Sequence, residues 1–280
     1  MKRVHSTVCA LLLLTFLLAA CGGGNSNTGS TQASTATKPA AANISLQVFA
    51  AASLTESFHD IAKQYQARHP NVSIKYNFNG SQLLEQQIAN GAPADVFASA
   101  DQTNMKKASA ASVVESAQIF AQNRLVVIVP TGNKNVTGLK DLAKSGVKID
   151  IGAAAVPAGK YSQQVLDKMG ASPQYGADYE ASVKKNIVSQ EENVKAVVQK
   201  VQLGEVDAGF VYRTDVTNAV SAKVTVIDIP DTFNVIAQYP IAVTKNAPHH
   251  NEAQDFVNYV LSSDGQAVLQ KYHFIAAPGK

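Results

Sequence analysis

The sequence predicts an α/β protein with two lobes, each built on a mostly parallel sheet that helices flank. Short apolar runs rich in β-branched residues alternate along residues 44–272 with segments whose apolar residues recur at helical spacing. Strands separated by helices favour parallel pairing under a helical cover. The alternation begins again after a run that ends at Pro130. A chain of 280 residues is also close to the length at which single cores divide.

The first unit begins with a compact apolar run and an amphipathic helix. Leu54, Phe58 and Ile61 fall on one helical face, and Pro70 ends the segment because proline cannot continue a helix. We expect strands at residues 44–50, 72–78 and 95–99, and helices at residues 54–65, 82–89 and 102–108.

The second unit repeats the alternation, and the chain then returns to the first unit. Its expected strands are residues 125–129, 149–153, 206–212 and 224–229, and its expected helices are residues 159–169 and 194–201. An extended return over residues 233–243 precedes two closing helices at residues 252–261 and 264–272. We therefore assign residues 44–125 and 235–280 to lobe I and residues 126–234 to lobe II, with two hinge crossings near residues 125 and 235–239.

The first 20 residues have the pattern of a secretory signal. A basic start at Lys2 and Arg3 precedes a short apolar stretch over residues 8–20, whereas a membrane span needs about 20 apolar residues. The ending Leu-Ala-Ala-Cys at residues 18–21 resembles a bacterial lipobox, in which Cys21 is acylated and becomes the N-terminus. The alternative is a plain signal peptide with an incidental cysteine.

Residues 21–43 are rich in Gly, Ser, Thr and Ala, so we expect a flexible tether between a lipid-held Cys21 and the folded part. The protein would then be exported and anchored on the extracytoplasmic side of the cell membrane. Loss of residues 1–20 also removes Cys9, which leaves one thiol and no disulfide. It leaves 22 basic and 21 acidic residues, a balance that gives no sign of nucleic-acid binding.

Three junctions between a strand and a helix carry a hydroxyl group. Ser53 stands three residues before Glu56, Ser81 follows a small turn, and Ser189 stands three residues before Glu192. In open α/β sheets, ligands bind at the edge where strands end, and helix N-termini offer free N–H groups to anions. Each serine taken alone is more simply explained as a helix cap.

The junctions also contain two carboxylates, a Pro/Gly turn and a tyrosine hydroxyl. Glu191 and Glu192 are expected in the first turn of a helix, where they would complement its dipole and point outward; a metal-binding carboxylate pair is the alternative. A Pro/Gly turn at residues 156–161 can present a backbone amide. The strand at residues 208–212 delivers Tyr212 at its end, either to a site or to the edge of the core.

Six motifs in chain order resemble the molybdate-binding periplasmic-type proteins of ABC transporters. Any one of them would be weak evidence, whereas six in order are specific and cover nearly all of the region expected to fold. The motifs are residues 48–54 (VFAAASL), 91–97 (GAPADVF) with 99–101 (SAD), 156–159 (VPAG), 192–194 (ENV), 209–212 (GFVY) with Asp215, and 239–240 (YP).

The resemblance implies a type II periplasmic binding protein, in which two lobes surround a cleft that captures molybdate or tungstate. It implies that the anion is held by the hydroxyls of Ser53 and Ser81 from lobe I. From lobe II it implies the amides of Ala158 and Val194 and the hydroxyl of Tyr212. No cofactor and no side-chain metal ligand are expected. The implied partners are an ABC permease and its ATPase, and the binding protein is expected to be a monomer.

A buried dianion without a counter-charge needs hydrogen bonds to its oxygens. Each hydrogen bond to a charged group contributes about 1.5–3 kcal/mol, so five or more can support sub-micromolar affinity, about −8 kcal/mol or better. Donors divided between two lobes act together only in a closed form, so binding favours closure. Arg213 follows Tyr212 where the family often has a small residue, and a guanidinium that points inward would contradict this neutral site.

Other binding functions stay open at this point. Sulfate has the charge of molybdate but is smaller, so a cage sized for molybdate would leave some of its bonds too long. Phosphate would need an acceptor for its remaining proton, and Asp95 and Asp101 lie near in sequence. Ferric sites in related folds use two or more tyrosines, whereas only Tyr212 stands at a suitable junction.

We do not expect an enzyme. The chain has neither a Gly-x-Ser-x-Gly nor a His-Glu-x-x-His motif. Ser53 and His59 would face different sides of a helix, and His249 and His250 are expected to face solvent. A structural or adhesive lipoprotein is a further alternative, against which the ordered motifs argue.

Overall fold

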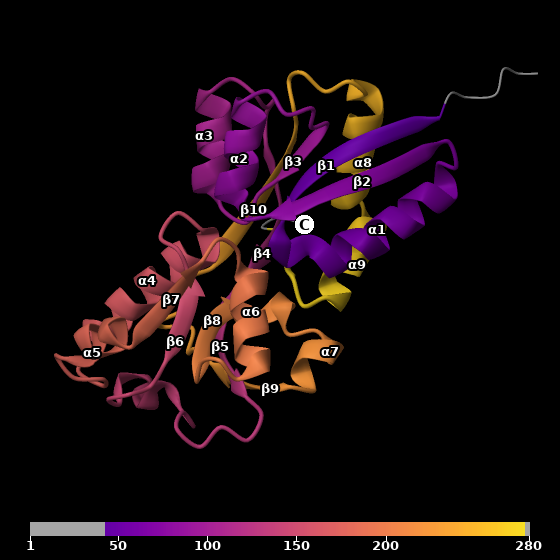
Figure 1. The fold of residues 1–280 in the computed structure, drawn as a ribbon. Helices are drawn as coiled ribbons and strands as arrows, with labels where there is room; N and C mark the ends of the chain where they lie inside the picture. The colour runs from indigo at the N-terminus through magenta and orange to yellow at the C-terminus, as the bar shows by residue number, and fades with distance from the viewer. Residues whose placement is uncertain (1–42, 278–280) are drawn as a thin grey trace, which may run out of the picture. The chain divides into compact units, whose positions relative to one another are not determined.

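The computed structural model describes residues 43–277, which form one compact unit. The predicted signal segment 1–20, the predicted lipidation site Cys21 and nearly all of the predicted tether lie outside the described residues. Two separate sheets form the centre of the compact unit, each with its own helices (Figure 1). None of the helices in the described part is both long and apolar enough to cross a membrane.

The first sheet has six strands in the order β11-β4-β10-β3-β1-β2. Both β2 and β3 pair with β1 in parallel, while β10 and β11 bring antiparallel pairs. The strands are β1 Ile44–Ala51, β2 Val72–Asn79, β3 Val96–Ala98, β4 Gln118–Asn123, β10 Ala237–Val243 and β11 Ile275–Ala276. The accompanying helices are α1 Thr55–Arg68, α2 Ser81–Ala89, α3 Gln102–Ala110, α8 His250–Leu261 and α9 Ser263–Lys271.

The second sheet has five strands in the order β7-β6-β8-β5-β9. Its strands are β5 Leu125–Pro130, β6 Ile149–Gly152, β7 Ile187–Glu191, β8 Ala208–Tyr212 and β9 Val224–Asp228. Its α-helices are α4 Pro157–Gly170, α5 Tyr179–Lys185, α6 Val194–Leu203 and α7 Asn218–Ser221. Three short 3₁₀ helices complete the described elements, and they are η1 Ala52–Leu54, η2 Leu139–Ala143 and η3 Arg213–Asp215.

The apolar pattern of each helix buries one face on its sheet. In α1, Phe58 and Ile61 are fully buried, and the Phe58 ring lies 5.8 Å from that of Phe120 and 6.3 Å from that of Phe256. Tilted and edge-on contacts of this kind stabilise aromatic clusters beyond the area that they bury. The helix ends at Arg68, just before Pro70, as the sequence predicts.

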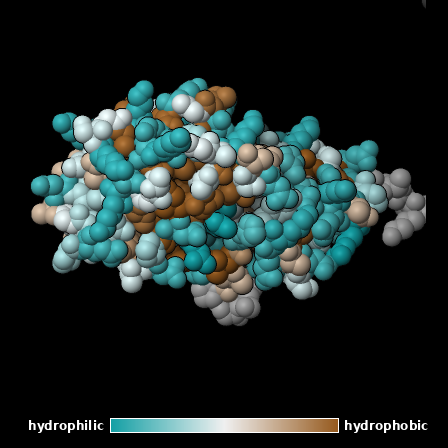
Figure 2. Space-filling model, turned by 90° about the horizontal axis from the view of Figure 1, so that it is seen from below, coloured by the Kyte–Doolittle hydropathy of each residue, from teal (hydrophilic) through white to brown (hydrophobic). Residues whose placement is uncertain are grey.

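Few large hydrophobic side chains remain exposed in the described part, namely those of Val188, Leu203 and Ile236. Figure 2, a view from below, shows apolar side chains that gather near the middle of that face within a rim of hydrophilic ones. Most large apolar residues are instead buried in a core that continues from the first sheet to the second.

The α/β prediction with two helix-flanked sheets is confirmed, but the expectation of mostly parallel pairing is wrong. Each sheet is mixed, because β10 is antiparallel to β3 and β4, and β5 is antiparallel to β8 and β9. Parallel neighbours require a crossover connection on the same sheet. The connections from β4 to β5 and from β9 to β10 pass between the sheets instead, so the strands at these passages enter antiparallel.

We call the first sheet with its helices lobe I and the second with its helices lobe II. The chain leaves the first sheet after Asn123, enters the second at Leu125, and returns between Asp228 and Ala237. The predicted boundaries near residues 125 and 235 stay a prediction. The extended return begins later than expected, because the N–H groups of Phe233 and Asn234 bond back to Pro230 in a turn.

Strands β4, β7 and β11 and helices α5 and α7 were not predicted. Strand β7 contains Ser189 and Glu191, which we had expected at the start of a helix. Helix α6 begins at Val194, and Asn193 caps it by accepting a hydrogen bond from the N–H of Ala196 at 3.2 Å. Pairing with β6 therefore holds residues 187–191 extended, and the expected acidic first turn is absent.

Strand β6 carries a buried carboxylate, Asp150. Neither of its oxygens has a hydrogen-bond partner among the described residues. Burial, with a contribution from the nearby Glu191 carboxylate, raises the pKa of Asp150 to about 6 from the ordinary value of 3.8. The folded state therefore binds a proton more readily here than the unfolded state does, and it loses stability as the pH rises through about 6.

Asp150→Asn should gain stability relative to the parent protein as the pH rises from about 5 to about 8. The gain over this range is expected to be about 1 kcal/mol, because about one pH unit separates pH 5 from the folded pKa of about 6, and each unit corresponds to about 1.4 kcal/mol. Urea unfolding at the two pH values measures it.

Asp207→Asn is the matched control for this prediction. Burial acts to raise the pKa of Asp207, but hydrogen bonds from the N–H of Lys148 and from Asn135 and Asn133 hold it below its ordinary value. Asp207 is therefore ionised across this range, and the effect of its substitution should not vary with pH. A pH-independent effect of Asp150→Asn would contradict the prediction.

Candidate functional site

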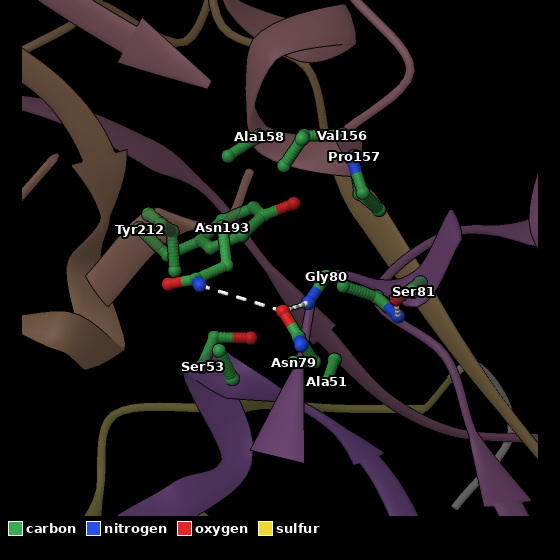
Figure 3. Close-up of a pocket in the computed structure, with 13 residues that line it drawn as sticks. Ala51, Ser53, Asn79, Gly80, Ser81, Val156, Pro157, Ala158, Asn193 and Tyr212 are labelled. Carbon is green, nitrogen blue, oxygen red and sulfur yellow. Dashed lines mark hydrogen bonds between the residues drawn. The ribbon is translucent and has the colours of Figure 1, made fainter. Parts of the chain in front are cut away.

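A small cavity lies where helix starts of lobe II face the ends of β1 and β2 in lobe I (Figure 3). Its volume of about 10 Å³ is near the space that one water-sized sphere needs. A cavity of this size suits one small species rather than a sugar or a peptide. It is lined by Ala51, Ala52, Ser53, Asn79, Gly80, Ser81, Ala100, Val156, Pro157, Ala158, Asn193, Val194 and Tyr212.

Ser53 lies in η1, the tight turn between β1 and α1, and is almost fully buried. Its Oγ is 2.9 Å from the Oη of Tyr239, and its hydroxyl points toward the cavity (Figure 3). The residue before α1 is Leu54, and α1 has no side-chain cap. The capping box expected from the spacing of Ser53 and Glu56 is therefore absent, and the simpler explanation of Ser53 as a helix cap is wrong.

Ser81 is the first residue of α2, next to Gly80 at the cap position. Its Oγ accepts a hydrogen bond from the N–H of Ala100 at 2.9 Å. Since a hydroxyl has one proton and two lone pairs, this bond leaves its proton free for another acceptor. Alanine and glycine dominate this wall of the cavity, so a ligand can approach the backbone closely.

The opposite wall consists of two helix starts. Helix α4 begins with Pro157, which has no N–H, so the first free amide belongs to Ala158. Val194 is the first residue of α6, and its N–H likewise has no acceptor within the helix. Helix α4 approaches β6 closely at Gly159, where a Cβ atom would lie 2.0 Å from the carbonyl oxygen of Gly152.

Tyr212 ends β8 and is 1% exposed. Its hydroxyl has no hydrogen-bond partner among the described residues and points into the cavity (Figure 3). Burial raises the pKa of Tyr212 well above its ordinary value, so the phenol stays neutral and can donate. A buried donor without a partner is costly, which makes this hydroxyl a candidate ligand-binding group.

The five residues predicted to bind the oxyanion thus line one cavity, although they come from five separate elements. Ser53 and Ser81 belong to lobe I, whereas Ala158, Val194 and Tyr212 belong to lobe II. Each offers a hydroxyl or backbone donor, and all the residues that line the cavity are uncharged. Their role in binding stays a prediction.

The charged residues that would have favoured a different ligand lie outside the cavity. The guanidinium of Arg213 is 3.6 Å from Asp228, so Arg213 does not point into the cavity. Asp95 accepts hydrogen bonds from the backbone N–H groups of Gln47 and His249, and Asp101 caps α3. Neither carboxylate lines the cavity.

No group of three or more His, Cys, Asp and Glu residues in the described part of the chain could hold a metal ion. His59 packs against the rings of Tyr76 and Phe78 at 5.4 and 5.3 Å. His250 contacts Glu115 at 2.8 Å. These histidines are engaged away from Ser53 and the cavity.

Polar contacts between side chains of one lobe and groups of the other surround the cavity, and sequence reasoning missed them. The Lys195 ammonium contacts the Glu56 carboxylate at 2.8 Å, and the Gln82 amide donates to the carbonyl oxygen of Glu192 at 2.9 Å. On another side, Lys160 lies 3.7 Å from Asp101. These side chains are far apart in sequence, so only the closed fold brings them together.

Lys195 also lies 3.4 Å from Asp215, a fully buried carboxylate of its own lobe. Burial acts to lower the pKa of Lys195, but the carboxylates of Asp215 and Glu56 hold it above its ordinary value. The lysine therefore stays charged. When the lobes are closed, Glu56 is its second carboxylate partner beside Asp215.

Residues 46–275 match the family model described as bacterial extracellular solute-binding protein. The chain belongs to this family. It is 33% identical over 271 residues to the molybdate-binding protein ModA of Mycobacterium tuberculosis H37Rv, covering 96% of this chain and 97% of that one. As a member of an extracellular family of transport proteins, rather than of an enzyme family, this protein is exported.

Two further relatives agree with this assignment. YvgL of Bacillus subtilis, named as a proposed ABC transporter substrate-binding lipoprotein, is 33% identical over 99% of this chain and 100% of its own. The solved periplasmic molybdate-binding protein of Azotobacter vinelandii has a TM-score of 0.71 and 22% identity over 83% of this chain and 99% of that one; at this identity it shows the fold alone. These findings confirm the family resemblance that the six motifs indicated.

Gly80 lies where the two lobes come close together, since a Cβ atom there would lie 2.3 Å from the carbonyl oxygen of Glu192. The φ of Gly80 is −59°, so other residues fit its backbone. Gly80→Trp should therefore hold the lobes apart without disturbing either core, and the melting temperature should stay within a few degrees of the parent value. Small-angle X-ray scattering should give a larger radius of gyration for Gly80→Trp than for the parent protein.

Gly138→Trp is the control, because a Cβ atom at Gly138 meets no other atom within 4 Å. This variant should keep the parent radius of gyration. If both variants scattered alike, Gly80 would not limit the approach of the lobes.

Proposed function

We propose that this protein captures molybdate or tungstate in the cavity between its lobes and delivers the anion to an ABC importer. The observation that carries the proposal is the convergence of five uncharged donors on a cavity lined by no charged side chain. The ModA name of the relative at 33% identity supports the same ligand.

The donor set matches a small dianion that carries no proton. Such an anion only accepts hydrogen bonds, and the cavity offers it the hydroxyls of Ser53, Ser81 and Tyr212 and the amides of Ala158 and Val194. The starts of α4 and α6 add the positive ends of their dipoles. Hydrogen bonds to a charged group contribute about 1.5–3 kcal/mol each, which can offset the loss of hydration.

Hydrogen phosphate fits the cavity less well, because its remaining proton needs an acceptor. No carboxylate lines the cavity. The side-chain oxygen of Asn79 already accepts from the N–H of Gly80 at 2.8 Å and from Asn193 at 3.5 Å (Figure 3). Sulfate carries no proton, so its rejection would rest on size alone, and sulfate is the rival that a binding experiment must address.

The division of donors suggests how binding is coupled to delivery. We assign residues 44–125 and 235–280 to lobe I and residues 126–234 to lobe II, and the complete donor set exists only when they close. The anion then stabilises the closed form, which a permease and its ATPase would recognise. Acylation of Cys21 would hold this monomer at the outer side of the cell membrane.

Isothermal titration calorimetry tests the ligand directly. Molybdate and tungstate should bind more tightly than sulfate and hydrogen phosphate. Ser53→Ala and Tyr212→Phe should each weaken molybdate binding about 10- to 100-fold, because each removes one hydrogen bond to a charged group. Tighter binding of sulfate than of molybdate would overturn the proposed ligand.

Matched controls exist for both substitutions. Ser57 is buried in α1 and bonds only to the carbonyl oxygen of Leu54 in the described part, at 3.1 Å. The hydroxyl of Tyr65 is buried without a partner, like that of Tyr212, but Tyr65 does not line the cavity. Ser57→Ala and Tyr65→Phe should therefore keep the parent affinity. Normal binding by both site variants would mean that the donor assignment is wrong.

The contact between Lys195 and Glu56 leads to a separate kinetic expectation. Glu56→Gln removes a cross-lobe ion pair but leaves Lys195 paired with Asp215. Partly exposed pairs contribute about 0.2–1 kcal/mol, so molybdate should dissociate up to about fivefold faster. Stopped-flow dissociation measures this rate.

Glu180→Gln serves as the comparison, because Glu180 pairs with Lys184 within lobe II. That variant should release the anion at the parent rate. Equal rates for the two variants would show that the cross-lobe pair does not stabilise the closed form.

A further inference from the structure

A chain of three buried polar side chains runs from the crossing between the lobes to the cavity. Asn123, the last residue of β4, has its Nδ2 atom 3.2 Å from the Oη of Tyr239 in β10. The Tyr239 Oη lies 2.9 Å from the Oγ of Ser53. Asn123 and Tyr239 are fully buried and do not line the cavity. Tyr239 of the YP motif therefore contacts Ser53 from outside the cavity.

The orientation of the Asn123 amide is fixed by a backbone donor. The N–H of Arg124 donates to Asn123 Oδ1 at 2.9 Å. Because a backbone N–H can only donate, the oxygen must be on that side. The two protons on Nδ2 then go to Thr214 Oγ1, at 2.8 Å, and to Tyr239 Oη.

This orientation determines the direction of the next bond. Tyr239 Oη accepts from Asn123, and its own proton needs an acceptor. Among the described residues the remaining hydrogen-bond partner of this hydroxyl is Ser53 Oγ. If Ser53 donated instead, the Tyr239 proton would be buried without a partner, which is costly. Burial also raises the pKa of Tyr239, so the phenol keeps its proton.

Ser53 Oγ consequently accepts a hydrogen bond from Tyr239, and its own proton is free to be donated into the cavity. We propose that Asn123 and Tyr239 are positioning residues that fix Ser53 as a donor and so select oxyanions without a proton over oxyanions that carry one. This inference rests on the proposed function and assigns part of its selectivity to two residues outside the cavity. An anion that presents an O–H to Ser53 would meet a second donor instead of an acceptor.

Sulfate and hydrogen phosphate form a matched pair of probes for this selectivity. At about pH 8, above the second pKa of a phosphate group, both are tetrahedral dianions of similar size, and they differ by one proton. Their affinities are measured by competition against bound molybdate. The readout is the ratio of the two dissociation constants, because changes in charge or in general fit affect both anions and largely cancel in the ratio.

Asn123→Asp should lower the preference for sulfate over hydrogen phosphate by about tenfold or more, the value of one hydrogen bond to a charged group. The new carboxylate keeps the bond from the Arg124 N–H and offers an oxygen to Tyr239. Tyr239 then donates away from Ser53 and accepts the Ser53 proton, so Ser53 presents a lone pair to the cavity. Tyr239→Phe removes the constraint on Ser53 and should lower the preference in the same direction.

Thr214→Val is the control, because it removes the other acceptor of Asn123 and leaves the path to Ser53 intact. It should keep the parent ratio. If the parent protein binds these anions but the ratio is unchanged in both Asn123→Asp and Tyr239→Phe, the inference is overturned and the proposed function stands. If the parent binds none of the oxyanions, the proposed function fails and the inference fails with it.

Discussion

An anion can be buried without a cation only where enough uncharged donors converge on it, and much of the structure serves this constraint. The donors at the cavity are hydroxyls and the free amides of helix starts, which keep their positions because they belong to regular elements. Charged groups are kept to the flanks, where Lys195 and Lys160 meet carboxylates of the other lobe. The charges near the site therefore hold the lobes together and leave the cavity neutral.

The same constraint explains the small residues around the site. A backbone N–H group has no side chain to extend its reach, so the chain that carries it must come close to the ligand and to the other lobe. Gly80 allows the carbonyl oxygen of Glu192 to approach, and Gly159 allows α4 to lie against β6. A side chain at Gly159 would move the amide of Ala158, which is the neighbouring residue. The positions of these glycines thus follow from donor geometry rather than from a need for flexibility.

The sequence predicts local features of this architecture well and distant contacts poorly. A junction between a strand and a helix is specified by a few consecutive residues, so the elements that carry Ser53 and Tyr212 could be identified from the sequence. Ser189 fits a capping pattern as well as Ser53 does, yet it lies in β7 because pairing with β6 outweighs the local signal. The bond between Ser53 and Tyr239 joins residues 186 positions apart, and no local pattern specifies it.

Two buried asparagines occupy the passages between the lobes, and their amides explain why these passages hold together. Asn234 on the return passage accepts from the N–H of Leu125 at 3.1 Å and donates to its carbonyl oxygen at 2.8 Å, as a neighbouring strand would. Asn123 on the outward passage joins Thr214 to Tyr239. An amide suits both positions because it donates and accepts at once. The residue that we propose orients Ser53 therefore also ties the outward passage to lobe II through Thr214.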